Sequence, residues 1–164
     1  MQKGLATLEI IFAIIIIGVL VKVAVPNAAR ILDTAALDYE TKKLYSELRF
    51  VQEMNRSSTV VSTGTGRTEQ SGDYIILTIK RNEKFYQVSR GTASLREPHS
   101  FSYGVTVKLE NSDDKIITIY FKSDGHADIN GKNADTIILT SRRGKKRKII
   151  FDNVGRIRAS LTND

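Results

Sequence analysis

The hydrophobic pattern divides the first 56 residues of the chain into two stretches. Residues 5–25 form an apolar run that only Glu9 and Lys22 interrupt, and residues 10–21 carry no charge. As a helix, residues 5–25 are about 32 Å long, enough to cross a hydrocarbon core of roughly 30 Å. We therefore assign residues 5–26 to a helix that spans a membrane or packs among similar apolar helices.

Residues 27–56 have the composition of a helix but a different pattern. They are rich in helix-forming residues and contain neither proline nor glycine. Charged residues fill one face, and the other carries four apolar residues at near-helical spacing, Leu37, Leu44, Leu48 and Val51. Pro26 lacks an N–H group and clashes with the preceding turn, so we expect a bend there. The pattern predicts one bent helix over residues 5–56, about 78 Å long, whose amphipathic second half packs on a globular head.

Residues 57–72 separate this helix from a region of different pattern. Eleven of these sixteen residues are Ser, Thr or Gly, which predicts a flexible loop. Over residues 73–164, short segments rich in Ile, Val, Thr and aromatic residues alternate with Gly, Asn and Asp turns. We expect strands at residues 74–80, 84–89, 101–110, 115–122, 135–141, 148–152 and 156–160. The predicted fold class is therefore α+β, with a long N-terminal helix and a head of two antiparallel sheets.

The carboxylate of Glu9 needs a partner in these apolar surroundings. A central acidic residue costs about 2.5–3.5 kcal/mol on membrane-insertion scales. Lys22 lies near the other end of the run, where its ammonium group can reach the headgroups. An amine would suit Glu9: a cut after Gly4 would give Leu5 a new α-ammonium group one helical turn away. The terminal amine of an adjacent subunit would serve equally well.

Three interpretations of residues 1–26 follow. A secretory signal peptide accounts for Lys3 and the apolar core, but not for Glu9 inside that core or for the poor cleavage site at residues 23–28. A plain single-pass anchor accounts for the hydrophobicity and leaves Gly4 and Glu9 unexplained. The third interpretation is a resemblance, and particular residues carry it.

The run begins with the segment Gly4-Leu5-Ala6-Thr7-Leu8-Glu9, in which Glu9 lies four residues after Leu5. Gly18 follows within the isoleucine-rich stretch, and Pro26 lies twenty-one residues after Leu5. This arrangement resembles the N-terminus of type IV prepilins and type II secretion pseudopilins. Lys22 and a leader with a single basic residue depart from the usual pattern of that family.

The resemblance implies that residues 1–4 are a leader, that a prepilin peptidase cuts between Gly4 and Leu5, and that the new amine of Leu5 is methylated. It implies that Glu9, Gly18 and Pro26 act in subunit assembly. The chain between Gly18 and Pro26 would unwind in the fibre.

A second, less specific pattern lies in the C-terminal part of the chain. Tyr120–Gly125 precedes a predicted strand at Thr136–Leu139, a basic turn, Ile149–Phe151 and finally Gly155–Arg158. This order is similar to the C-terminal part of the GspH/FimT family of minor pseudopilins and minor pilins. The resemblance implies a structural subunit with a cytoplasmic N-terminus, one span in the cytoplasmic membrane and a head outside it. Its implied partners are membrane lipid before assembly, a prepilin peptidase, other pilins or pseudopilins and the inner-membrane assembly platform.

Charge gives a second functional indication. The formal net charge is +7, and the last 24 residues carry eight basic and two acidic side chains, which is almost the whole excess. Arg156 and Arg158 lie two residues apart and should project from one face of a strand. The other six cations flank Gly144 in a predicted hairpin tip: Arg142, Arg143, Lys145, Lys146, Arg147 and Lys148.

Such a cluster attracts DNA or another polyanion through phosphate contacts and counterion release. It is equally typical of a solvated turn, or of a contact with acidic neighbours in a fibre. Some FimT-type minor pilins bind DNA during natural transformation through a Gly-Arg-x-Arg motif, which Gly155-Arg156-Ile157-Arg158 matches. Secretion-type relatives carry similar residues, and few aromatic residues interleave with the basic tip, which argues against base stacking.

Catalytic chemistry is not expected. The chain has no cysteine, which excludes disulfides and thiolate metal sites. Asp124, His126 and Asp128 alternate, but they lack the ligand pattern of a calcium loop and are better interpreted as turn residues. No nucleophile elbow, phosphate loop or zinc spacing is present. We therefore expect neither an enzyme nor a cofactor or metal.

Three functions remain open at this point. The chain starts or caps a type II secretion pseudopilus, it binds DNA on a transformation pilus, or it is a membrane-anchored binding module that never assembles.

Overall fold

A computed structural model describes residues 2–57, 74–102, 104–122, 124–133 and 135–160, with side chains from Leu8 onward. Apart from Ser57, the predicted loop at residues 57–72 lies outside the described residues. The chain divides into two compact units, Met1–Ala35 and Ala36–Asp164, which are treated separately below.

The predicted helix is confirmed as a single element, α1, which spans Gln2–Ser57. The helix continues through Pro26, and the bend expected there stays a prediction. In the first unit, the large apolar side chains from Leu8 to Val25 are 52–63% exposed. This stretch of α1 is long and apolar enough to cross a membrane.

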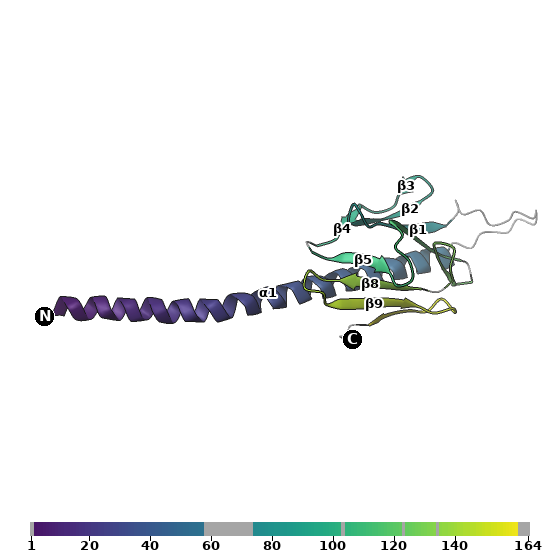
Figure 1. Cartoon of the computed structure of the whole chain (residues 1–164). Helices are drawn as coiled ribbons and strands as arrows, with labels where there is room; N and C mark the ends of the chain where they lie inside the picture. Colours follow the sequence, from purple (N-terminus) through teal and green to yellow (C-terminus); the bar gives the residue numbers. More distant parts are fainter. Residues whose placement is uncertain (1, 58–73, 103, 123, 134, 161–164) are drawn as a thin grey trace, which may run out of the picture. The chain divides into compact units, whose positions relative to one another are not determined.

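The head contains two antiparallel sheets, which confirms the predicted fold class (Figure 1). The first sheet has the order β3-β2-β1-β6-β7, with β4 also paired to β2. Its strands are β1 Ile75–Lys80, β2 Phe85–Arg90, β3 Ala93–Ser94, β4 His99–Ser100, β6 Ile116–Phe121 and β7 Ala127–Ile129.

The second sheet has the order β10-β9-β8-β5. Its strands are β5 Thr106–Leu109, β8 Thr136–Thr140, β9 Lys146–Phe151 and β10 Ile157–Ser160. In Figure 1, β5, β8 and β9 lie side by side. Strands β8, β9 and β10 follow one another in the chain and pair antiparallel with their neighbours, so they form a meander.

One apolar core joins the two sheets to the second half of α1. Buried and partly exposed side chains alternate along β1, where Ile75, Leu77 and Ile79 are buried, because successive residues of a strand point to opposite faces. The predicted apolar face of the helix is confirmed, since all four of its members are fully buried: Leu37, Leu44, Leu48 and Val51. Burying one such side chain contributes about 1.5–3 kcal/mol.

Two polar side chains tie the parts of the head together. The side-chain amide of Asn55 donates to the Ile75 carbonyl oxygen, and its oxygen accepts from the Ile75 N–H group, both at 2.8 Å. This pair fixes the start of β1 to the last turns of α1. Arg81, which follows β1, donates from Nε to the Val107 carbonyl oxygen at 2.9 Å and so links the first sheet to β5 of the second.

Several strand predictions were wrong in detail. The predicted strand at residues 101–110 shortens to Thr106–Leu109, because a turn closed by the Val105 N–H and the Ser102 carbonyl oxygen precedes it. The short strands β3, β4 and β7 were missed. Residues 127–129, expected as a turn, form β7, which pairs with β6. Strand β9 begins at Lys146 rather than at residue 148, so the hairpin tip is shorter than expected.

Candidate functional site

The residues expected to act in processing and assembly all lie on the first half of α1. Gly4 and Leu5 belong to the helix, but their side-chain environment lies outside the described part of the chain. Glu9 is exposed, and none of the described residues forms a hydrogen bond or ion pair with its carboxylate. A Cβ added at Gly18 would meet nothing within 4 Å. Pro26 lies inside the helix.

This half-helix is apolar all round, and no described residue of its own unit covers it. A helix of that kind is stable when a membrane or other apolar helices surround it. None of the described residues buries its isoleucines or pairs with the Glu9 carboxylate.

The basic hairpin tip between β8 and β9 is well defined. The Ser141 hydroxyl oxygen accepts from the N–H groups of Arg143 at 3.3 Å and Lys145 at 3.2 Å, and Gly144 adopts a φ of 83°. Four side chains at this end of the sheet are exposed: Arg142, Arg143, Lys145 and Lys146.

Two of the six cations expected at the tip point elsewhere. Arg147 is buried, and its Nε lies 2.8 Å from a carboxylate oxygen of Asp38 on α1. Lys148 lies one strand position further on the outer face, with its Nζ 3.0 Å from Glu110 Oε1. The hydrogen bond from Lys148 holds the pKa of Glu110 below its usual value. The run of basic residues is thus split by the alternation of strand β9.

Arg156 and Arg158 lie at the opposite end of β9 from the tip. Six residues of extended strand, about 20 Å, separate the two ends. Both side chains are exposed and Ile157 between them is buried, as the alternation predicts. Arg158 Nη2 lies 2.6 Å from an Asp152 carboxylate oxygen, whereas no described residue pairs with the Arg156 guanidinium. The eight predicted residues therefore form no single patch.

The turn that carries Arg156 is held tightly in place. Gly155 has a φ of 76°, and a Cβ there would overlap the carbonyl oxygen of Gly125 in the turn between β6 and β7. Gln52 of α1 donates from Nε2 to the Gly155 carbonyl oxygen at 2.6 Å. Glycine is required at this position because two backbone turns meet there, and the result is a fixed starting point for the Arg156 side chain.

An open cleft lies where these two turns meet the last turns of α1. It is lined by Arg49, Gln52, Arg56, Asp124, Gly125, Val154, Gly155 and Arg156. Sequence reasoning missed the contribution of α1, although the positions of Arg49, Gln52 and Arg56 follow an i, i+3, i+7 pattern that places them on one helix face.

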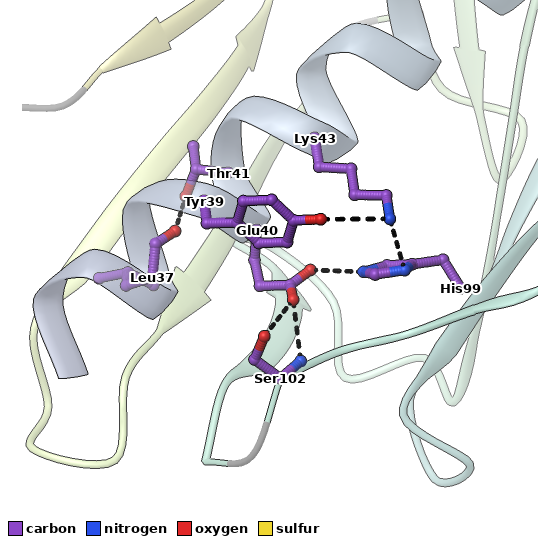
Figure 2. Close-up of polar contacts among 7 residues, drawn as sticks. All are labelled: Leu37, Tyr39, Glu40, Thr41, Lys43, His99 and Ser102. Atoms are coloured by element: carbon purple, nitrogen blue, oxygen red, sulfur yellow. Dashed lines mark hydrogen bonds and ion pairs between the residues drawn. The ribbon is translucent and has the colours of Figure 1, made fainter. Parts of the chain in front are cut away.

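Sequence reasoning also missed a buried polar cluster around Glu40, whose side chain is fully buried on α1 (Figure 2). One Glu40 oxygen accepts from the Ser102 N–H group at 2.9 Å and from the Ser102 hydroxyl. The other lies 2.9 Å from His99 Nε2, and Lys43 Nζ lies 2.9 Å from His99 Nδ1. Because an ammonium group only donates, Nδ1 accepts and Nε2 carries the proton that Glu40 receives.

The Glu40 cluster acts as a clamp. It attaches the segment around β4 to α1 and satisfies a carboxylate that would otherwise be buried without partners. The described residues contain no group of three or more His, Cys, Asp or Glu side chains that could hold a metal ion.

Comparisons with known proteins agree with this architecture. No protein-family model and no curated protein matches the sequence. Two crystal structures of the type IV minor pilin FimU from Pseudomonas aeruginosa are similar in fold. One matches with a TM-score of 0.53 and 19% identity over 76% of this chain and 87% of that chain. The other, from a second crystal form, has a TM-score of 0.52 and 16% identity over 75% and 91%.

The chain thus has the fold of a type IV minor pilin, with one long apolar N-terminal helix and a head of two antiparallel sheets. The predicted resemblance to type IV pilin-like proteins is confirmed at the level of the fold.

Proposed function

We propose that the chain is the precursor of a minor pilin or pseudopilin, a structural subunit rather than an enzyme. The observation that carries this proposal is the contrast within α1. An apolar half-helix, whose Glu9 has no partner among the described residues, precedes a half that is buried in the core of the head. The subunit waits in the cytoplasmic membrane as a single-pass protein, with its N-terminus in the cytoplasm and its head outside. Its partners are other pilins or pseudopilins and the assembly platform.

In this proposal a prepilin peptidase removes residues 1–4, and Leu5 becomes the methylated N-terminus. The Glu9 carboxylate then pairs with a terminal amine, either its own or that of a neighbouring subunit. Such a pair removes the penalty of about 2.5–3.5 kcal/mol that an isolated carboxylate carries in apolar surroundings. Glu9 therefore couples cleavage to assembly.

Intact mass after co-expression with a prepilin peptidase tests the processing step. We expect loss of residues 1–4 and gain of one methyl group. A Gly4→Leu variant is the matched control and should keep its leader. Native protein that still begins at Met1 would contradict the proposal and favour a membrane-anchored module that does not assemble.

Assembly is tested separately with Glu9→Ala, measured as the fraction of subunit recovered in sheared fibres. We expect incorporation to fall at least tenfold while cleavage continues. Normal incorporation of Glu9→Ala would remove the physical basis of the assembly proposal.

The exposed tip of the β8–β9 hairpin favours one alternative role, DNA binding on a transformation pilus. Four cations lie together there without burial: Arg142, Arg143, Lys145 and Lys146. Gel shifts of the full chain in detergent micelles test this role, with neutral variants of these four residues compared with wild type. DNA binding that is absent at moderate salt would leave the secretion pseudopilus as the favoured machine.

A further inference from the structure

Three arginines of the head, Arg49, Arg56 and Arg156, lack the carboxylate partners that other arginines have among the described residues. Arg147 and Arg158 each have a carboxylate partner. By contrast, no described carboxylate lies within salt-bridge distance of Arg49, Arg56 or Arg156, although all three line the cleft described above. Three exposed guanidinium groups that share one cleft repel one another, and an anion placed between them offsets that repulsion.

The cleft is held in shape before any ligand arrives. Arg49 donates from Nη1 to Gln52 Oε1 at 3.0 Å, and the amide of Gln52 in turn donates to Gly155 at 2.6 Å. The Arg49 guanidinium also lies over the Tyr45 ring, 5.9 Å from its centroid. This chain of contacts fixes α1 to the turn that carries Arg156, so little ordering remains to be done on binding.

We propose that this cleft binds a carboxylate from an acidic segment of another pilin or pseudopilin subunit. The inference rests on the proposed function for the existence of such a neighbour, and on the geometry of the cleft for its chemistry. A guanidinium group presents a planar fork of donors that matches both oxygens of a carboxylate. Arg56 and Arg156 would hold the carboxylate, and Arg49 would contribute from its fixed position beside Gln52.

The surroundings of the cleft favour a single carboxylate over the backbone of a nucleic acid. Asp124 belongs to the lining, and Glu53 is exposed one turn along α1 from Arg49. A polyanion that extended past the arginines would meet these negative charges, whereas one carboxylate would not. The described residues that line the cleft include no aromatic side chain, so they offer bases no stacking surface.

Two further features suit a peptide. The Asp124 carboxylate is turned toward its own turn, where Oδ1 lies 3.0 Å from His126 Nδ1 and 2.9 Å from the His126 N–H nitrogen. The Asp124 carboxylate therefore does not pair with the three arginines of the cleft. Val154 at the rim is 67% exposed and offers an apolar contact beside the cations.

The test uses the full chain in detergent micelles and, as the probe, a six-residue peptide with capped ends that has one central glutamate among serines. The Nε–H signals of arginine are followed by NMR during the titration. We expect the signals of Arg49, Arg56 and Arg156 to shift together, while that of Arg90, an exposed arginine on the other sheet, stays in place. Each of Arg56→Ala and Arg156→Ala should weaken peptide binding about tenfold.

Arg90→Ala is the matched control and should leave peptide affinity unchanged. Arg56→Lys keeps the charge but not the planar fork of donors. It should therefore weaken peptide binding about half as much as Arg56→Ala, on a logarithmic scale of affinity. The proposal is overturned if the three signals do not move, if Arg90→Ala weakens binding equally, or if inorganic phosphate binds as tightly as the peptide. It is also overturned if a 20-nucleotide DNA strand shifts these signals at lower concentration than the peptide. Processing by the peptidase is measured independently, so the proposed function can fail or stand without this site.

Discussion

Two glutamates on the same helix have opposite surroundings. Glu40 is fully buried, and its oxygens receive hydrogen bonds from His99 and from two groups of Ser102. Glu9 is exposed among apolar side chains, and no described residue pairs with it. A buried carboxylate is tolerated where the fold supplies its hydrogen-bond partners, so Glu40 contributes to the stability of the folded head. Glu9 has no such partner among the described residues, and we propose that it acts in assembly.

The apolar residues of α1 show the same contrast. Leu44 and Leu48 are fully buried against the two sheets, whereas Ile14 and Ile16 in the first unit are 63% and 58% exposed. Both stretches are helical, so helix propensity does not distinguish them. The difference lies in whether the described residues supply a covering surface. The following substitutions test this division in order of expected effect.

Replacement of Glu40 should have the largest effect on the head. Glu40→Ala leaves His99 and the Ser102 N–H group without their acceptor and opens a void, so we expect a loss of about 3–5 kcal/mol in the free energy of unfolding. Urea unfolding followed by near-ultraviolet circular dichroism measures this. Glu53→Ala, an exposed position on the same helix, is the control, and Glu9→Ala should leave head stability unchanged. A loss below 1 kcal/mol for Glu40→Ala would show that the clamp is dispensable.

Truncation of the buried leucines should come next. Leu44→Ala is expected to cost about 2–5 kcal/mol, because a cavity remains in a core that relaxes only partly. The matched change Ile14→Ala, in the exposed half of α1, should alter head unfolding by less than about 0.5 kcal/mol. Similar effects of the two substitutions in the same unfolding experiment would contradict the division of α1 into two roles.

The turn beside α1 provides a third test. Gly144 and Gly155 both have positive φ angles, of 83° and 76°. A Cβ at Gly144 meets nothing, while one at Gly155 overlaps the Gly125 carbonyl group. Gly144→Ala should therefore cost about 1–2 kcal/mol from backbone strain alone, and Gly155→Ala about 1–3 kcal/mol more. Equal melting temperatures for the two variants would mean that the two turns move apart at little cost in free energy.

The smallest effect is expected at the surface pair of Glu110 and Lys148. Because the hydrogen bond from Lys148 lowers the pKa of Glu110 in the folded state, the pair stabilises the head above the ordinary carboxyl pKa and loses this contribution as the pH falls through the lowered value. At neutral pH, Glu110→Gln should lower the melting temperature by no more than about 4 °C. Once the pH lies below the lowered pKa of Glu110, the variant and wild type should converge. A difference that grows in acid would have the wrong sign.

Much of the fold was predictable because it depends on periodic patterns. The spacing of Leu37, Leu44, Leu48 and Val51 identified the buried helix face without knowledge of its partner. The short strands β3, β4 and β7 were not predictable, since two or three residues carry no period and are held by neighbouring strands. Residues 127–129 read as a turn in sequence and become a strand because β6 pairs with them.

The candidate site was predictable only in part. The sequence located the cations near the C-terminus. It did not show that Arg147 faces the core while its neighbours face outward, because that alternation depends on where strand β9 begins. The arginines of α1 that line the cleft lie about a hundred residues before Gly155, and no local pattern connects them.

The sequence alone determined the apolar run, the isolated charge at Glu9 and the long helix, because hydrophobicity and helix spacing are properties of neighbouring residues. Only the tertiary structure decided which charged groups find partners: Glu40 pairs with His99, Arg147 with Asp38 and Arg158 with Asp152. It also decided which charges stay open in the cleft. Ion pairs form between side chains that folding brings within a few ångströms, and distance along the chain does not encode that proximity.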